Sequence, residues 1–468
     1  MKHYSSLERL EIIDIADEGK SVAKYGDIVV FVTGAVPGDI VDAKVIKKRR
    51  NFLEAKVINF HKYSDDRIKP FCKHFGVCGG CKWQSLSYEK QLFYKQKQVQ
   101  ECLQRIAKID VEGIILPIIP SANTNYYRNK LEYTFSCRRW LLDKDMQVAD
   151  ESRNMNGLGF HIPGMFDKVL DIETCYLQRE PTNAIRLAVK EYALKNNLQF
   201  FDLRKQTGFL RNMIIRTTQA GEVMVIVSFF HDEKKLRDAI LEYISNSFPE
   251  VTSLMYVINP KCNDVITDLE IQRYKGNPYI IETIGDLRFK IGPVSFFQSN
   301  TLQAYELYKT ILDFAALSGN EIVYDLYTGT GTIANFVAAS AQKVTGLEYI
   351  ESAVSDAFEN SRINGFSNTM FYAGDIAKVL NNTFVEANGI PDVVITDPPR
   401  SGMHKDVVQQ LLEIHPQKIV YVSCNPSTQA RDIALFSEKY DLVKSQPVDM
   451  FPHTHHIENV VLMVRRYK

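Results

Sequence analysis

Five short apolar runs alternate with helical stretches in the last third of the chain, and few folds accommodate that order. Each run has the length and composition of a buried strand. Repeated strand–helix alternation predicts a doubly wound, Rossmann-like α/β domain, in which helices cover both faces of a mainly parallel sheet. The runs are Val323–Leu326, Lys343–Glu348, Phe371–Asp375, Asp392–Asp397 and Lys418–Ser423.

A glycine-rich turn follows the first of these runs, in the sequence Asp325-Leu-Tyr-Thr-Gly-Thr-Gly331. Glycines at such a turn let the backbone approach a ligand closely. The second run ends in Glu348, 23 residues after Asp325, where a doubly wound fold holds a ribose. Dinucleotide-binding enzymes carry a third glycine, but position 334 is Ala, which argues against a nicotinamide dehydrogenase.

A cysteine follows the last of the five runs, in Tyr421-Val-Ser-Cys-Asn-Pro426. The proline ends the strand, so Cys424 is expected at the carboxyl rim of the sheet, where such folds bind ligands. A cysteine there can act as a covalent nucleophile, and Glu458 offers a carboxylate for proton transfer. The alternative is a small buried side chain with a structural role, as for most free cysteines.

Five motifs in order give the chain a resemblance to a known family. It resembles the S-adenosylmethionine-dependent RNA uracil-5-methyltransferases, specifically the bacterial 23S ribosomal RNA type, and the resemblance covers nearly the whole chain. The motifs are Phe296-Phe-Gln-Ser-Asn300, the glycine turn, Asp397-Pro-Pro-Arg-Ser-Gly402, Ser423-Cys-Asn-Pro426 and His456-Ile-Glu458.

The resemblance implies a chemistry for the two reactive side chains. Uracil C5 is too weak a nucleophile to take a methyl group directly, whereas addition of a thiolate at C6 makes C5 nucleophilic. Cys424 is then the nucleophile and Glu458 the base that removes the C5 proton. The resemblance also implies an S-adenosylmethionine pocket, to which it assigns Gln298, Tyr327, Glu348, Asp375 and Asp397. Packing is the alternative role for Tyr327, and a helix cap for Asp375.

The expected partner is 23S ribosomal RNA, at a uridine in a single strand or a loop. Transfer RNA is the alternative substrate. A cytosine-5 RNA methyltransferase is less consistent with the chain, because Asp397-Pro-Pro-Arg400 contains no cysteine. A noncatalytic RNA-binding protein would leave Cys424, Glu458 and the glycine turn together without a purpose.

Residues 1–62 predict a separate small β-barrel, because short strands there are separated by turn signals. The segment Val36-Pro-Gly-Asp-Ile-Val41 before a basic strand resembles the TRAM domain, an RNA-binding module of the OB-like type. Residues 43–56 carry six basic residues and one acid, which suits RNA backbone contact. A solvated hairpin face is the alternative.

A cysteine-rich loop, Cys72-Lys-His-Phe-Gly-Val-Cys-Gly-Gly-Cys81, follows the predicted barrel. Without a secretory signal, such cysteines indicate a metal or catalysis more than disulfides. Cys72, Cys78 and Cys81 supply three thiolates, and the resemblance adds Cys175 and implies a [4Fe-4S] cluster. Zinc is the alternative, since four thiolates suit either metal centre. The spacing differs from the C-x3-C-x2-C loop of radical enzymes. Core positions are predicted for Cys102, Cys137 and Cys262.

Residues 63–290 predict a central α+β domain that carries the cysteine site, and residues 291–468 the methyltransferase domain. An amphipathic helix is expected over Ser85–Ile109. A strand is expected over Tyr126–Phe135, where basic and aromatic residues alternate, so Arg128 and Lys130 are candidate RNA contacts.

The composition is that of an ordinary globular protein, with 45% hydrophobic and 24% charged residues. The formal net charge is zero, so any RNA-binding surface must be local. No apolar stretch approaches the length of a transmembrane helix, and the first residues have no signal-peptide core. We therefore expect a cytoplasmic, monomeric protein without a membrane partner.

Overall fold

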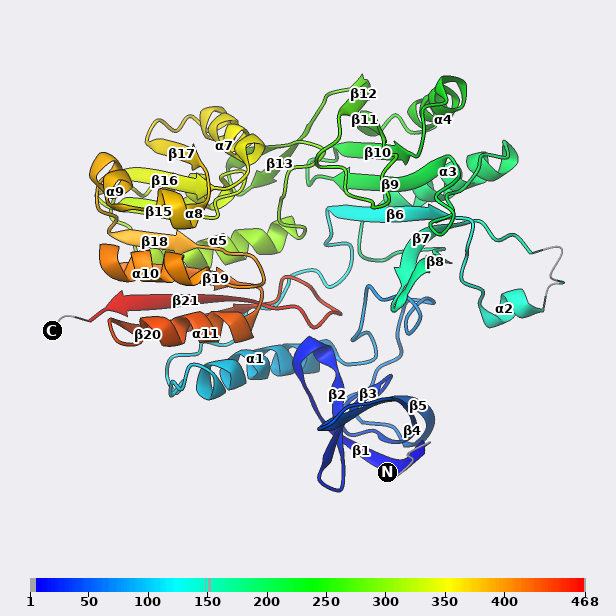
Figure 1. Cartoon of the computed structure of the whole chain (residues 1–468), viewed down its shortest axis with the longest axis horizontal. Coiled ribbons are helices and arrows are strands. Elements are labelled where there is room, and N and C mark those ends of the chain that lie inside the picture. Colours follow the sequence, from blue (N-terminus) through cyan, green and yellow to red (C-terminus); the bar gives the residue numbers. More distant parts are fainter. Residues whose placement is uncertain (1–5, 148, 150–152, 467–468) are drawn as a thin grey trace.

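The computed structural model describes residues 6–147, 149 and 153–466. Figure 1 shows three parts: a small N-terminal barrel, a central sheet, and a C-terminal sheet with its helices. The predicted fold class is confirmed, because the barrel is N-terminal and the C-terminal part is a doubly wound α/β domain. Among the described residues, no helix has the length and apolar character needed to cross a membrane.

The N-terminal barrel is closed by five strands in the order β1-β2-β3-β5-β4. Alternate residues of each strand point inward and form a small apolar core of their own, which includes Leu10, Val30, Val41 and Leu53. The basic segment, residues 43–56, lies in the hairpin of β4 and β5. The elements are β1 (Ser6–Ile15), η1 (Asp17–Gly19), β2 (Ser21–Tyr25), β3 (Ile28–Thr33), β4 (Ile40–Lys48) and β5 (Phe52–Lys62).

The central sheet has seven strands in the order β12-β11-β10-β9-β6-β7-β8. One face packs against α3 and α4, and the other joins the core of the C-terminal domain. Because both faces are covered, β9 and β10 are buried along their whole length, and β10 consists mainly of apolar residues. The elements are β6 (Lys130–Ser136), α2 (Asp143–Met146), β7 (Gly157–Ile162), β8 (Met165–Asp171), α3 (Thr182–Lys195), β9 (Leu210–Thr217), β10 (Val223–Phe229), α4 (Lys234–Ser247), β11 (Val251–Ile258) and β12 (Ile271–Gly276).

The C-terminal sheet has the order β17-β16-β15-β18-β19-β21-β20, and a two-stranded ribbon, β13 with β14, precedes it. Its first five strands are parallel, and β21 pairs antiparallel with β19 and β20. The five expected runs correspond to β15–β19. The elements are β13 (Ile280–Ile284), β14 (Leu287–Ile291), α5 (Thr301–Ala315), β15 (Ile322–Leu326), α6 (Thr332–Ala338), β16 (Lys343–Glu348), α7 (Glu351–Ile363), β17 (Thr369–Ala373), α8 (Ile376–Val379), α9 (Asn382–Asn388), β18 (Val393–Thr396), α10 (Lys405–Ile414), β19 (Lys418–Ser423), α11 (Pro426–Phe436), β20 (Tyr440–Val448) and β21 (Glu458–Arg465).

Side chains that alternate along each C-terminal strand supply two separate cores. Val323 of β15 packs with α5, α6 and α7 on one face, while the next residue, Tyr324, packs with α8–α11 on the other. Covering helices on both faces explain why these strands carry apolar residues on both faces.

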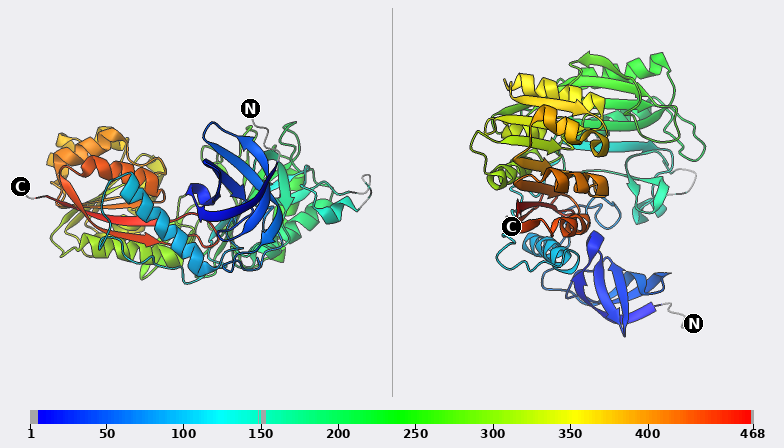
Figure 2. Two further views of the ribbon diagram at one scale, coloured as in Figure 1. Left: turned by 90° about the horizontal axis from the view of Figure 1, so that it is seen from below. Right: turned by 60° about the vertical axis from the view of Figure 1, so that its left-hand side comes forward.

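The expected helix over Ser85–Ile109 is shorter, α1 (Tyr88–Arg105), and it packs away from the central sheet. Val99 and Leu103 belong to the core that α11 and β20 form on one face of the C-terminal sheet. Figure 2 shows α1 lying along this sheet. The boundaries at residues 62 and 290 stay predictions, but α1 lies with the third domain although the sequence places it in the second.

The predicted core position of Cys262 is wrong, because this side chain is exposed. It lies just beyond Pro260 in the loop between β11 and β12, where the proline prevents the strand from continuing. Cys102 and Cys137 are half-buried. The strand expected over Tyr126–Phe135 begins later, since Tyr126 has a left-handed backbone with φ of 56°.

Candidate active site

A cavity of about 920 Å³ opens at the carboxyl ends of the parallel C-terminal strands. This is the edge at which open α/β sheets hold their ligands. Its lining includes most of the residues that the sequence predicts for the active site, namely Cys424, Glu458, Gln298, Tyr327, Glu348 and Asp397.

The glycine turn between β15 and α6 forms one wall. Tyr327, Gly329 and Gly331 all have left-handed backbones, with φ of 64°, 55° and 75°. For Tyr327 this conformation carries strain, as often at binding sites. At Gly331 a side chain would also collide, because an added Cβ would lie 2.9 Å from the Cβ of Ala357. The turn thus needs glycine at residue 331.

Two acids hold this turn in place. Asp325 is buried below it and accepts hydrogen bonds from the hydroxyl of Thr328 at 2.5 Å and from the amide of Ala334 at 3.0 Å. Burial raises the pKa of Asp325 to about 7. Glu348, at the end of β16, accepts the amide of Gly329 at 3.0 Å, which brings its carboxylate against the turn.

Cys424 lies between β19 and α11, as expected for a residue that ends a strand before a proline. Pro426 is the first residue of α11, where its missing amide costs nothing, and Asn425 caps that helix through the amide of Ser427. Burial, and after it the nearby Glu458, raise the pKa of the Cys424 thiol to about 11. Arg400, which lines the same cavity, lowers the pKa of this thiol.

Glu458 is the first residue of β21, and its side chain is buried beside Asp397. Burial and the neighbouring Asp397 raise the pKa of Glu458 well above its ordinary value. Burial also raises the pKa of Asp397 to about 7. The two carboxyl groups therefore do not titrate independently of each other.

Arg400 and His456 line the cavity but were not assigned roles from the sequence. The two side chains are hydrogen-bonded to each other. Burial and neighbouring cations, Arg400 first among them, lower the pKa of His456 to about 4, so its ring is neutral near pH 7. Both residues lie within motifs that carry the family resemblance, and this location in the sequence could have identified them as site residues.

The structure does not bring Asp375 into the main cavity. Asp375 is the N-cap of α8 and accepts the amide of Ala377 at 3.2 Å, which matches the alternative of a helix cap. Together with Tyr327, it lines an adjoining cavity, so Tyr327 borders both.

The four predicted metal-ligating cysteines line a second cavity, of about 260 Å³. Burial raises the pKa of Cys78, that of Cys81 to about 12 and that of Cys175 to about 11, and the thiols raise one another's values. Among the residues described, no three or more His, Cys, Asp or Glu side chains form a group that could hold a metal ion. Of the two candidate RNA contacts, Arg128 lines both this cavity and the main one. Lys130 lies in β6, where burial lowers the pKa of its ammonium group.

Comparisons with known proteins agree with this geometry. Residues 283–466 match the family model described as tRNA (Uracil-5-)-methyltransferase, and residues 7–58 match the TRAM domain. Proteins described as uncharacterized RNA methyltransferases are 53% identical in Porphyromonas gingivalis, over 97% of this chain and 99% of the relative, and 53% identical in Bacteroides thetaiotaomicron, over 97% and 100%.

A solved structure shares the whole architecture. The Pyrococcus abyssi tRNA (uracil-54, C5)-methyltransferase, in complex with S-adenosyl-L-homocysteine, superimposes with a TM-score of 0.77 and 27% identity, covering 97% of this chain and 100% of that one. The N-terminal barrel is a TRAM domain, and RNA is the substrate class of the relatives. The chain therefore belongs to the S-adenosylmethionine-dependent RNA uracil-5-methyltransferase family, and it is an enzyme.

Proposed function

We propose that this enzyme transfers a methyl group from S-adenosylmethionine to C5 of a specific uridine in 23S ribosomal RNA. The observation that carries the proposal is the convergence of Cys424, Arg400 and Glu458 on one cavity, at the rim where the fold binds its ligands. A thiol with an adjacent cation and a nearby carboxyl of raised pKa is the set that addition at C6 and proton removal at C5 require.

The residues of the glycine turn and its neighbours support a methyl-donor site. S-adenosylmethionine would supply the methyl group, and Gln298, Tyr327, Glu348 and Asp397 would hold it in the main cavity. Asp375 would contribute from the adjoining cavity that Tyr327 also borders. A tight turn between strand and helix suits a ligand that must approach the backbone closely.

The proposed reaction begins at Cys424. Its thiol keeps its proton in the free enzyme at pH 7, because burial raises the pKa to about 11. As RNA enters, the thiol releases its proton to solvent water, with the Arg400 guanidinium beside the resulting thiolate, and the sulfur adds to uracil C6 to give an enolate. C5 then takes the methyl group, Glu458 removes the C5 proton, and the C6–sulfur bond breaks to return the thiolate.

The main alternative substrate is transfer RNA. The family description and the Pyrococcus abyssi structure both name it, so this second candidate rests on specific observations. Sequencing of 5-methyluridine in ribosomal and transfer RNA, from cells with and without the gene, separates the two. Loss of 5-methyluridine at one position of 23S ribosomal RNA supports the proposal. Loss of 5-methyluridine from transfer RNA would show that transfer RNA is the substrate instead.

We also propose that the four cysteines hold a [4Fe-4S] cluster. Burial raises the pKa of Cys78, Cys81 and Cys175, and the thiols raise one another's values, which suits ligands whose protons a metal centre displaces. A single zinc ion would need all four sulfurs at about 2.3 Å from one point. A four-iron cluster would need more room, and the four cysteines line one cavity of about 260 Å³.

Metal analysis of anaerobically purified protein tests the cluster. We expect about four irons and four sulfides per chain. Cys78→Ser should lower RNA affinity more than the rate of the methyl-transfer step, because the cysteine cavity is separate from the reacting groups. Stoichiometric zinc without iron would assign the site to zinc. Light scattering of the same preparation tests the expected monomer.

A further inference from the structure

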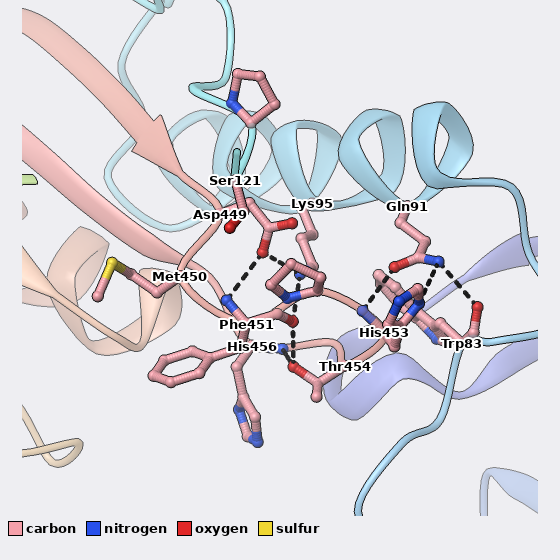
Figure 3. Close-up of polar contacts among 12 residues, drawn as sticks. Trp83, Gln91, Lys95, Ser121, Asp449, Met450, Phe451, His453, Thr454 and His456 are labelled. Atoms are coloured by element: carbon pink, nitrogen blue, oxygen red, sulfur yellow. Dashed lines mark hydrogen bonds and ion pairs between the residues drawn. The ribbon is translucent and has the colours of Figure 1, made fainter. Parts of the chain in front are cut away.

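The segment that connects β20 to β21, residues 449–457, contacts α1 and the N-terminal barrel and borders the main cavity. We call it the histidine loop, because it carries His453, His455 and His456. It leads directly into Glu458, the proposed base, and His456 faces the main cavity. Figure 3 shows the polar contacts that hold this loop against α1.

The start of the histidine loop is fixed by a buried ion pair. The carboxylate of Asp449 accepts the Lys95 ammonium at 2.6 Å and the Tyr88 hydroxyl at 2.9 Å, and both members of the ion pair are 0% exposed. The same Lys95 donates to the carbonyl of Phe451 at 3.0 Å (Figure 3). Two residues of the loop, Asp449 through its side chain and Phe451 through its carbonyl, are thus tied to α1.

The middle of the loop is fixed at His453, which has a left-handed backbone with φ of 64°. The side chain of Gln91 accepts its amide at 2.8 Å. Its carbonyl accepts two amides, those of Lys82 at 2.9 Å and Trp83 at 3.0 Å. Such a conformation persists where surrounding contacts over-determine it.

The TRAM barrel reaches the histidine loop through the turn between β1 and β2. The Trp83 indole donates to the carbonyl of Gly19 at 3.3 Å, and the Lys82 ammonium donates to the carbonyl of Glu18 at 3.2 Å. Gly19 is also packed directly on the loop, because a Cβ added there would lie 2.7 Å from the Cβ of His455.

The other end of the loop acts on the reacting groups. His456 is hydrogen-bonded to Arg400, which lines the main cavity together with Cys424 and lowers the pKa of its thiol. The next strand begins at Glu458. A displacement of the loop would therefore move both the cation beside the thiol and the carboxyl that is proposed to take the C5 proton.

We propose that docking of the TRAM barrel at Gly19 positions the histidine loop, and with it Glu458 and Arg400, for the chemical steps. Gly19 and Trp83 are then positioning residues, and the barrel contributes to turnover in addition to RNA affinity. The inference rests on the proposed function, since it assigns no reaction of its own.

Two glycine substitutions in the same barrel separate positioning from backbone strain. Gly19 and Gly26 both have left-handed backbones, with φ of 71° and 61°, so alanine strains the two turns alike. Of the two, Gly19 alone would place its added Cβ in a steric clash, with His455, whereas nothing lies within 4 Å of a Cβ added at Gly26. Gly26→Ala is therefore the matched control for Gly19→Ala.

We expect Gly19→Ala to lower kcat on a uridine-containing RNA by on the order of tenfold to a hundredfold relative to Gly26→Ala, because a shift of about 1 Å in a catalytic group has effects of this size. KM for RNA should differ by less than about threefold between the two variants. A methylated protein–RNA adduct should accumulate only in Gly19→Ala, because removal of the C5 proton by a displaced Glu458 becomes slow. Binding of S-adenosylmethionine, measured by calorimetry, should be equal.

Equal kcat values for the two alanine variants would overturn the inference, as would a change confined to KM. Absence of uracil-5 methylation by the wild-type enzyme would instead contradict the proposed function. If Gly19→Ala does not fold, Trp83→Phe removes the donor to Gly19 but keeps an aromatic ring, and Trp140→Phe is its control. A wild-type kcat for Trp83→Phe then overturns the inference.

Discussion

The buried ion pair of Lys95 and Asp449 predicts a large, pH-dependent loss of stability in Asp449→Asn. The substitution keeps the shape of the side chain but leaves the Lys95 ammonium without its counter-charge at a fully buried position. Breaking a buried pair on one side costs about 3–5 kcal/mol. The ammonium can instead release its proton, which costs about 1.4 kcal/mol for each pH unit below the ordinary lysine pKa of about 10.4. At pH 7 this cost is about 5 kcal/mol, and it sets the upper limit of the stability loss.

The direction of the pH dependence follows from the same proton. Burial lowers the pKa of Lys95, and Asp449 opposes that effect. In Asp449→Asn the folded state binds the Lys95 proton more weakly than the unfolded state, so stability is lost as pH falls and regained as pH rises. We expect the deficit relative to wild type to shrink by about 1.4 kcal/mol per unit between pH 7 and pH 9.

Urea unfolding followed by tryptophan fluorescence measures the deficit. The chain has two tryptophans, so Trp140→Phe in both proteins leaves Trp83, beside the histidine loop, as the reporter. Asp14→Asn is the matched control, because Asp14 pairs with Lys97 of the same helix while both side chains are about a third exposed. We expect this control to lose less than about 1 kcal/mol. An equal loss in the two variants, or a deficit independent of pH, would refute the account of a buried charge pair.

Three further predictions concern the reacting groups. Glu458→Gln should lower turnover by about 10² to 10⁴-fold, and gel analysis should detect a methylated protein–RNA adduct; turnover at the wild-type rate would exclude Glu458 as the base. Single-turnover release of the methylated RNA from its Cys424 adduct should accelerate with rising pH, because the pKa of Glu458 is raised well above its ordinary value and the base must be ionised to remove the C5 proton; Asp397→Asn, at saturating S-adenosylmethionine, should shift this profile to lower pH, and an unshifted profile would contradict the effect of Asp397 on Glu458. Arg400→Met should slow adduct formation with 5-fluorouridine RNA by about tenfold or more, with Arg400→Lys retaining most of the rate; equal rates would show that the cation does not assist the thiol.

Local patterns sufficed to predict much of the fold. The strands β15–β19 were recognisable because both of their faces are covered, which places apolar residues on both sides of each strand. Cys424 could be placed after β19 because Pro426 is compatible with the first turn of a helix and incompatible with a continuing strand. Both inferences use residues that are neighbours in the sequence.

Contacts between distant residues could not be read in this way. Lys95 and Asp449 are 354 positions apart, and nothing in the sequence around α1 indicates which sheet it covers. Arg400 was visible within its motif, but its proposed role depends on a thiol 24 residues later, which only the fold brings close. Asp375 follows an apolar strand as Glu348 does, yet it turns to cap α8.

The central claim is that Cys424 bonds covalently to uracil C6 during methyl transfer. RNA containing 5-fluorouridine tests it most directly, since fluorine at C5 cannot leave as a proton and the adduct is trapped. After incubation with S-adenosylmethionine and digestion, mass spectrometry should locate one methylated fluorouridine on the peptide that contains Cys424, and Cys424→Ala should give no adduct while still binding S-adenosylmethionine. An adduct on another residue, or normal methyl transfer by Cys424→Ala, would contradict the account.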